Sequence, residues 1–335
     1  MENYINLKEY EGNKPGEYSI IAINAEPGWE LKVNIDANKN LFKQLYALVN
    51  KKYPYMYVLR LIIITSDVCN TYNQLIKSIK GKQEIVAPLS DNFIAGKSFC
   101  WGNINSDNLN DYHATIILNE RFVAAALLYN DALGLGIAVH ELTHVGEGVL
   151  EKLSLGINDV NTIKFDEWDR IKNSIARSIN SEYRANMVAF QFLVEDETCL
   201  WERILESVEY LQSCKIFMSE RYEDYLSHKN IYRFWLEIID SIYRSFSALG
   251  RSFGFLKYCK DDKWKKYIGI IQSIDVGLVD IIIELRERLY AIDGEYEKDD
   301  FDKIATVVEK GFEKMGIKPF FNESGTFNVK ILFEQ

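Results

Sequence analysis

Helical periodicity over the second half of this chain constrains its fold more than any other feature. From Leu200 to Lys314, apolar residues recur at the three- and four-residue spacing of amphipathic helices. Only five prolines occur in the 335 residues, so few positions would interrupt such helices. The last segment, 325–333, instead alternates apolar and polar residues as a strand does. We therefore predict a helical C-terminal region over 200–335 that ends in one strand.

The first 199 residues mix the two periodicities. Extended segments are predicted at 18–24 and 30–35, which would form a hairpin or two edge strands, and at 57–65, 98–101 and 113–118. Helices are predicted at 38–52, 72–80, 119–129, 131–151 and 166–194, the last with a break near Asn180. The fold class that follows is α+β and mainly helical, with a first domain over 1–199 and a helical region over 200–335.

Net charge argues against one class of partner. The chain carries 39 Lys plus Arg against 49 Asp plus Glu, a formal charge of −10. Such a surface repels phosphate backbones, so nucleic-acid binding is not expected. Segment 257–267 interleaves lysines with aromatic residues, but Asp261 and Asp262 interrupt it, and a solvated helix face explains the pattern.

Cysteine usage and the lack of long apolar runs indicate a cytoplasmic protein. The five cysteines are odd in number and form no CxxC pair, which fits reduced thiols better than a disulfide framework. The N-terminal residues do not form a basic segment followed by an apolar one, as a secretion signal would. No apolar run approaches the roughly 18 residues of a spanning helix, so no membrane association is expected.

One motif carries chemistry: His140-Glu141-Leu142-Thr143-His144, within a predicted helix. A helix advances about 100° per residue, so the two histidines lie on one face and can bind one metal ion. Glu141 projects beside that ion, where a carboxylate can take a proton from a metal-activated water. The motif holds half of the chain's four histidines. Apolar residues on the opposite side would bury the helix: Val139, Leu142 and Val145.

A catalytic zinc ion needs a third protein ligand. The best candidate is Glu182, 38 residues after His144 and far enough along for a second helix to pack alongside. Asn186 lies one turn later on the same face and could accept a hydrogen bond from a ligand histidine. The alternatives are no third ligand, or one of three earlier acidic residues: Asp166, Glu167 or Asp169. Glu147 and Glu151 follow on the histidine helix, on a face that His144 already occupies.

The HELTH motif followed by E-x-x-A-N-x-x-A, starting at Glu182, resembles the gluzincin metallopeptidases and is most similar to the ImmA/IrrE-like family. The resemblance covers roughly residues 110–195. It implies a zincin-like core: a small mixed sheet with an edge strand, an active-site helix and a glutamate helix. It also implies Zn²⁺ as cofactor and hydrolysis of a peptide or protein substrate, with Glu141 as general base. Residues 113–118 resemble the edge strand that aligns a peptide.

The sequence leaves three points open. The group that stabilises the oxyanion could be His228, Tyr232 or His113, for which residue type is the only argument. The chain could instead be a non-catalytic zinc-binding regulatory or interaction protein that retains the site. It could also be a helical interaction module in which the motif is incidental.

Overall fold

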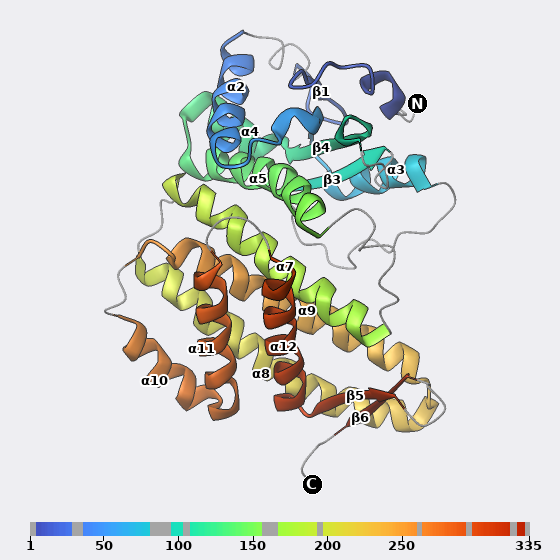
Figure 1. Cartoon of the computed structure of the whole chain (residues 1–335), viewed down its shortest axis with the longest axis vertical. Coiled ribbons are helices and arrows are strands. Elements are labelled where there is room, and N and C mark those ends of the chain that lie inside the picture. The colour runs from blue at the N-terminus through green and yellow to red at the C-terminus, as the bar shows by residue number, and fades with distance from the viewer. Residues whose placement is uncertain are drawn as a thin grey trace. The chain divides into compact units, whose positions relative to one another are not determined.

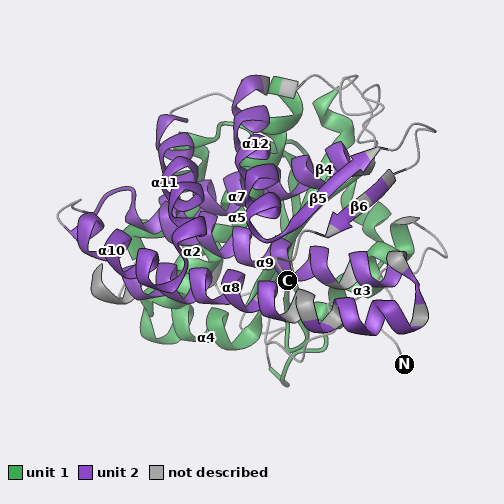
Figure 2. Ribbon diagram, turned by 90° about the horizontal axis from the view of Figure 1, so that it is seen from below, with its two compact units in different colours: residues 1–160, 188–194 green, residues 161–187, 195–335 purple. Residues whose placement is uncertain are grey.

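The structure is a computed structural model of the chain. It describes residues 5–28, 36–80, 95–102, 108–155, 167–192, 197–259, 263–292, 297–321 and 327–331. The chain divides into two compact units, coloured separately in Figure 2. The first comprises residues 1–160 and 188–194, and the second comprises 161–187 and 195–335.

The first unit is built on a small mixed sheet (Figure 1). Its strands are β1 (Ser19–Ala22), β2 (Leu59–Thr65), β3 (Gly96–Gly102) and β4 (Tyr112–Asn119), in the order β1-β2-β4-β3. β1, β2 and β4 are parallel, whereas β3 pairs antiparallel with β4. Every residue of β2 and β4 is buried, as expected of inner strands covered on both faces. Together with the helices, this sheet confirms the predicted α+β, mainly helical class.

The strand order bears on two expectations about the strands and corrects one of them. Segments 18–24 and 30–35 were expected to form a hairpin or two edge strands. β1 lies at one end of the described sheet and pairs in parallel with β2, whereas 30–35 lies outside the described residues, so the hairpin stays a prediction. Segment 113–118 was expected to be an edge strand, but β4 lies between β2 and β3. Among the described strands, β3 ends the sheet beside β4, as β1 does at the opposite end. β3 extends the predicted strand at 98–101 by two residues at its start and one at its end.

Helices cover both faces of this sheet. On one face, α3 (Val68–Lys80) packs in an apolar cluster with Leu61 and Ile117, and the short 3-10 helix Leu7–Tyr10 adds Leu7 to it. On the other face, Leu118 lies among side chains of α2 (Asp36–Lys52), α4 (Glu120–Tyr129) and α5 (Ala132–Leu155). These helices confirm the predicted ones, and α4 begins where the Asn119 side chain accepts from the Arg121 N–H. Two further 3-10 helices, Met56–Val58 and Leu109–Asp111, precede β2 and β4.

Close packing explains why α5 tolerates interior glycines. A Cβ at Gly134 would lie 2.4 Å from the Phe122 carbonyl oxygen of α4, and one at Gly146 would lie 2.5 Å from the Tyr53 Cβ. A larger residue at either position would push α5 away from its neighbours. Each glycine costs the helix about 1 kcal/mol in propensity against alanine. The close contact of α5 with its neighbours at these two glycines offsets that cost.

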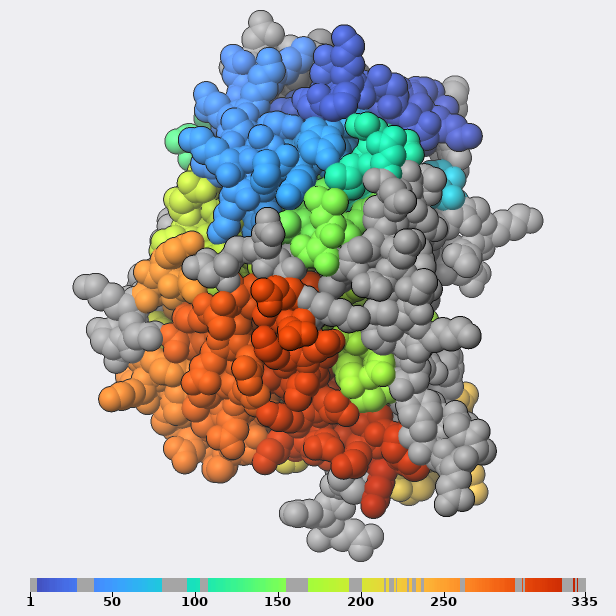
Figure 3. Space-filling model, in the orientation of Figure 1, coloured from blue at the N-terminus to red at the C-terminus, as the bar shows by residue number. Residues whose placement is uncertain are grey.

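The second unit is a set of helices with a terminal two-stranded ribbon. The helices are α7 (Glu167–Ala189, whose last residues belong to the first unit), α8 (Glu197–His228), α9 (Ile231–Leu256), α10 (Trp264–Ile274), α11 (Val276–Ala291) and α12 (Lys298–Lys314). In Figure 3, α10 to α12 form one continuous surface, coloured orange to red. β5 (Ile317–Phe321) and β6 (Phe327–Ile331) pair antiparallel after α12. The helical region and its last strand confirm the prediction, although β5 was not anticipated.

Two glycines bring α9 close to α7. A Cβ at Gly250 would lie 2.3 Å from the Ile179 carbonyl oxygen, and one at Gly254 would lie 2.3 Å from the Tyr183 carbonyl oxygen. This contact groups α7 with the C-terminal helices, whereas the predicted division at 1–199 and 200–335 grouped it with the N-terminal part. α7 also runs unbroken through Asn180, where a break was expected. It is followed by the 3-10 helix Phe190–Phe192, which returns to the first unit.

None of the helices in the described part of the chain combines the length and the apolar character that a membrane crossing requires.

Candidate metal centre

The two motif histidines lie one turn apart on α5, as the helical period predicts. Their Nε2 atoms are 3.0 Å apart, and their rings meet edge to face. On the opposite side of α5, Val139 and Leu142 are fully buried, which anchors the helix against the unit's core. Two imidazole nitrogens at this distance must share a proton or a cation, because two facing lone pairs would repel each other.

Glu147 supports one of these histidines. Its carboxylate oxygen Oε2 lies 3.5 Å from Nδ1 of His144, three residues earlier on the same helix, and its side chain is nearly buried. A carboxylate beside Nδ1 favours a proton on that nitrogen, which leaves Nε2 as an acceptor for a metal. From the sequence, Glu147 is a candidate only as a competing ligand. The three-residue spacing from His144 was the signal for this supporting position.

Glu141 lies against the start of the terminal strand. A Cβ at Gly96, the first residue of β3, would stand 2.6 Å from Cγ and 3.0 Å from Oε1 of Glu141. Glu141 is 7% exposed, so its carboxylate is held between α5 and the β3 backbone. Only a residue without a side chain fits beside it. Gly96 is thus a second site residue that the sequence did not identify, because it precedes Glu141 by 45 positions.

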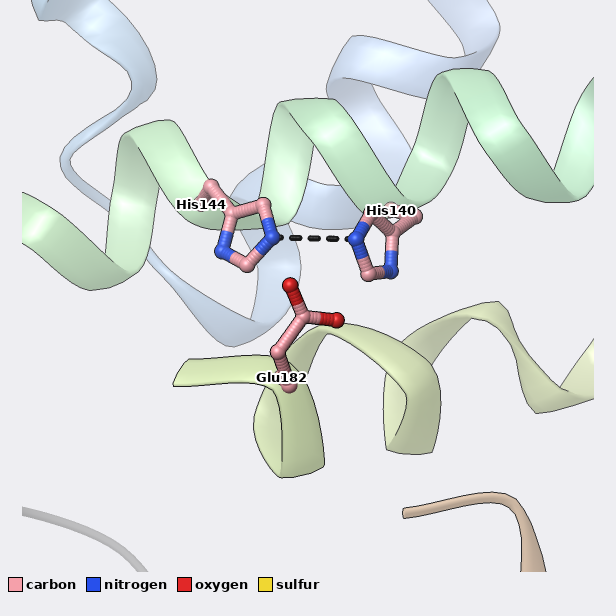
Figure 4. Close-up of side chains that lie close together, drawn as sticks. All are labelled: His140, His144 and Glu182. Carbon is pink, nitrogen blue, oxygen red and sulfur yellow. Dashed lines mark hydrogen bonds between the residues drawn. The ribbon is translucent and has the colours of Figure 1, made fainter. Parts of the chain in front are cut away.

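Glu182, on α7, completes a group of three donor residues. His140, His144 and Glu182 each offer one ligand atom, and these atoms all lie within 4.8 Å of one another. Figure 4 shows the Glu182 carboxylate turned toward the two imidazoles. All three side chains are only partly buried, so solvent can reach the group. The structure thus brings together the three residues predicted as ligands.

Arg251 on α9 contacts this carboxylate. Its Nε donates to Oε2 of Glu182 over 3.1 Å. The arginine is half-exposed and the glutamate much less so. Because 69 residues separate the two positions and no motif includes Arg251, the sequence carried no signal for this pair.

The other candidate residues on α7 or just before it have different surroundings. Asp169 pairs with Lys172 on α7, with Oδ1 and Nζ 2.6 Å apart. Asp166 and the side chain of Glu167 lie outside the described residues. Asn186 is buried, and its side-chain nitrogen donates to the Glu182 carbonyl oxygen over 2.8 Å. That bond steadies the glutamate's own turn of α7, and the proposed bond from Asn186 to a histidine stays a prediction.

Of the three oxyanion candidates, His113 lies on the wrong face of the sheet to reach the motif. Its ring packs on Trp101, with centroids 4.7 Å apart, in the layer that α3 covers. Its neighbour Tyr112 points toward Gly148 of α5, and successive strand residues face opposite sides. Burial, reinforced by Arg60, lowers the pKa of His113. His228 ends α8 and Tyr232 lies in the first turn of α9, but their side chains are outside the described part.

Comparison of the chain with protein-family models, with curated proteins and with solved structures finds no match.

Proposed function

We propose that this protein is a zinc-dependent metallopeptidase of the gluzincin type. The single observation that carries the proposal is the convergence of His140, His144 and Glu182 within 4.8 Å, with Glu141 beside them. Two imidazoles and one carboxylate are the donor set of a catalytic zinc site that keeps one position open. Two nitrogens that each bind zinc at 2.0–2.1 Å in tetrahedral geometry stand about 3.3 Å apart, close to the 3.0 Å between the Nε2 atoms.

A zinc ion in this site would polarise the carbonyl of a scissile bond and make a water molecule more acidic. Glu141 supplies the proton transfer. It follows a ligand histidine directly, so its carboxylate lies beside the donor group rather than within it. Packed on the Gly96 backbone, it is oriented before substrate arrives. Glu141 accepts the proton of the attacking water and passes it to the leaving amine.

The terminal strand β3 is the proposed peptide-aligning element of a zincin-like core. It ends the sheet and begins beside Glu141. Backbone groups at a sheet edge can pair with an extended peptide, which would place a scissile bond next to the general base. This assigns to β3 the role that the sequence suggested for 113–118.

Zinc binding by the purified chain tests the site. We expect one zinc ion per chain by elemental analysis, and weaker zinc binding by the Glu182→Gln variant, because a neutral amide replaces the anionic ligand. Asp169→Asn makes the same change on the same helix, at a residue already paired with Lys172. We expect that control to retain zinc. A chain that binds no zinc, or equal binding by the two variants, contradicts the proposed ligand set.

Peptide cleavage tests the activity. The zinc-loaded protein is incubated with a library of unstructured peptides, and products are identified by mass spectrometry. We expect cleavage that chelation abolishes and zinc restores. Stoichiometric zinc without cleavage of any peptide would favour the alternative, a zinc-binding regulatory protein.

Gly96 offers a further test of the general base. Gly96→Ala places a methyl group where Glu141 now lies, so the carboxylate must move by about an ångström, and a misplacement of that size can cost about 100-fold in rate. We expect a fall in kcat of that order with zinc content unchanged. Gly102→Ala at the other end of β3 is a poor control because its φ of 86° is strained for alanine; Ser98→Ala is preferable. Equal kcat in Gly96→Ala and wild type would contradict the placement of Glu141.

A further inference from the structure

The close contact of α9 with α7 sets the position of Arg251. Gly250 and Gly254 lie against the carbonyls of Ile179 and Tyr183, one turn apart on each helix. Arg251 directly follows the first glycine, and Glu182 directly precedes Tyr183. The backbone contact therefore fixes two facing positions, and the Arg251 side chain meets the Glu182 carboxylate at 3.1 Å.

This ion pair is poorly placed to stabilise the fold. The Arg251 side chain is 51% exposed, and exposed pairs contribute about 0–1 kcal/mol. Glu182, at 18% exposure, is the more enclosed partner and is also one of the three metal donors. An arginine held by helix packing against a donor carboxylate thus has little effect on folding but a direct effect on how that carboxylate is presented.

We propose that Arg251 is a positioning residue that holds Glu182 as a zinc ligand. The inference rests on the proposed function. The guanidinium holds Oε2 and so would fix the orientation in which the Glu182 carboxylate is presented to zinc. Hydrogen bonds to ligating carboxylates act in this way, and their loss weakens metal binding by about 10–100-fold. Arg251 acts through Glu182 and takes no part in proton transfer.

The test measures zinc affinity by chelator competition in Arg251→Ala, Arg251→Lys and Arg244→Ala. Arg244 is a matched control on the same helix, paired with Asp240 at 2.9 Å. We expect zinc binding about 10–100-fold weaker in Arg251→Ala, partial recovery in Arg251→Lys and no change in Arg244→Ala. Circular dichroism and thermal unfolding establish that each variant is folded; if Arg251→Ala is not, the lysine variant carries the comparison.

Two further measurements separate the positioning of Glu182 from an effect on zinc binding that does not act through Glu182. Cobalt(II) replaces zinc, and its visible absorption reports the coordination geometry. We expect an altered spectrum in Arg251→Ala and the wild-type spectrum in Arg244→Ala. In the Glu182→Gln background, Arg251→Ala should cause no further loss of affinity, because its partner is already gone.

The outcomes distinguish this inference from the proposed function. If wild type binds zinc but Arg251→Ala matches Arg244→Ala in both affinity and cobalt spectrum, the positioning role is wrong while the zinc site stands. An additive loss in the double variant overturns it as well. If wild type binds no zinc, both proposals fall.

Discussion

Peptide hydrolysis by the Glu141→Gln variant is expected to be about 10²–10⁴-fold slower than by wild type, with zinc still bound. Glutamine has nearly the same shape and fills the same space beside Gly96, so the packing of α5 on β3 is preserved. It cannot accept a proton from the attacking water, and Glu141 is not among the three donor residues. The kcat for a cleaved peptide and the zinc content of the same sample are the two measurements.

Glu147→Gln is the matched control for this variant. Both glutamates lie on α5, both are buried, and they are six residues apart. Glu147 faces Nδ1 of His144, so its loss should weaken zinc binding by about 10–100-fold and leave kcat largely intact when zinc is saturating. The two substitutions should therefore separate proton transfer from metal binding. Wild-type kcat in Glu141→Gln would remove Glu141 from the mechanism.

The local part of the site was predictable because helical geometry is fixed by the chain itself. The period alone brings His140 and His144 to one face and buries Val139 on the other, and the structure agrees. The Glu147 support follows the same rule at three residues. Glu182 required a further step, from donor chemistry to a distant helix, and the structure brings its carboxylate to the histidines.

The rest depends on contacts that sequence spacing does not encode. Strand order is one: β4 and β3 are both apolar enough to be strands, and only their pairing decides which one ends the sheet. Helix pairing is another. Nothing in the period of α9 reveals that Gly250 meets a carbonyl of α7, and hence that Arg251 reaches Glu182. Such contacts come from packing between segments that are distant in the sequence. The same packing places most of α7 in the second unit.

The double variant Gly250→Ala/Gly254→Ala is expected to lower the free energy of unfolding by about 2–4 kcal/mol. Each new Cβ would lie 2.3 Å from a backbone carbonyl oxygen, so α7 and α9 must separate. Overpacking costs about 1–3 kcal/mol per site, and the better helix propensity of alanine offsets about 1 kcal/mol per site, so the net cost for the two sites is about 0–4 kcal/mol. The upper part of this range applies because a backbone carbonyl cannot rotate away as a side chain can. Urea unfolding followed by circular dichroism measures the change.

Gly269→Ala on α10 supplies a control of opposite sign. No atom lies within 4 Å of a Cβ at Gly269, so alanine should stabilise that helix by up to about 1 kcal/mol. The double variant should also bind zinc more weakly, since separating α9 from α7 withdraws Arg251 from Glu182, whereas Gly269→Ala should bind it normally. Stabilisation by all three alanines would mean that α7 and α9 do not meet at these glycines, and the basis for positioning Arg251 would be lost with them.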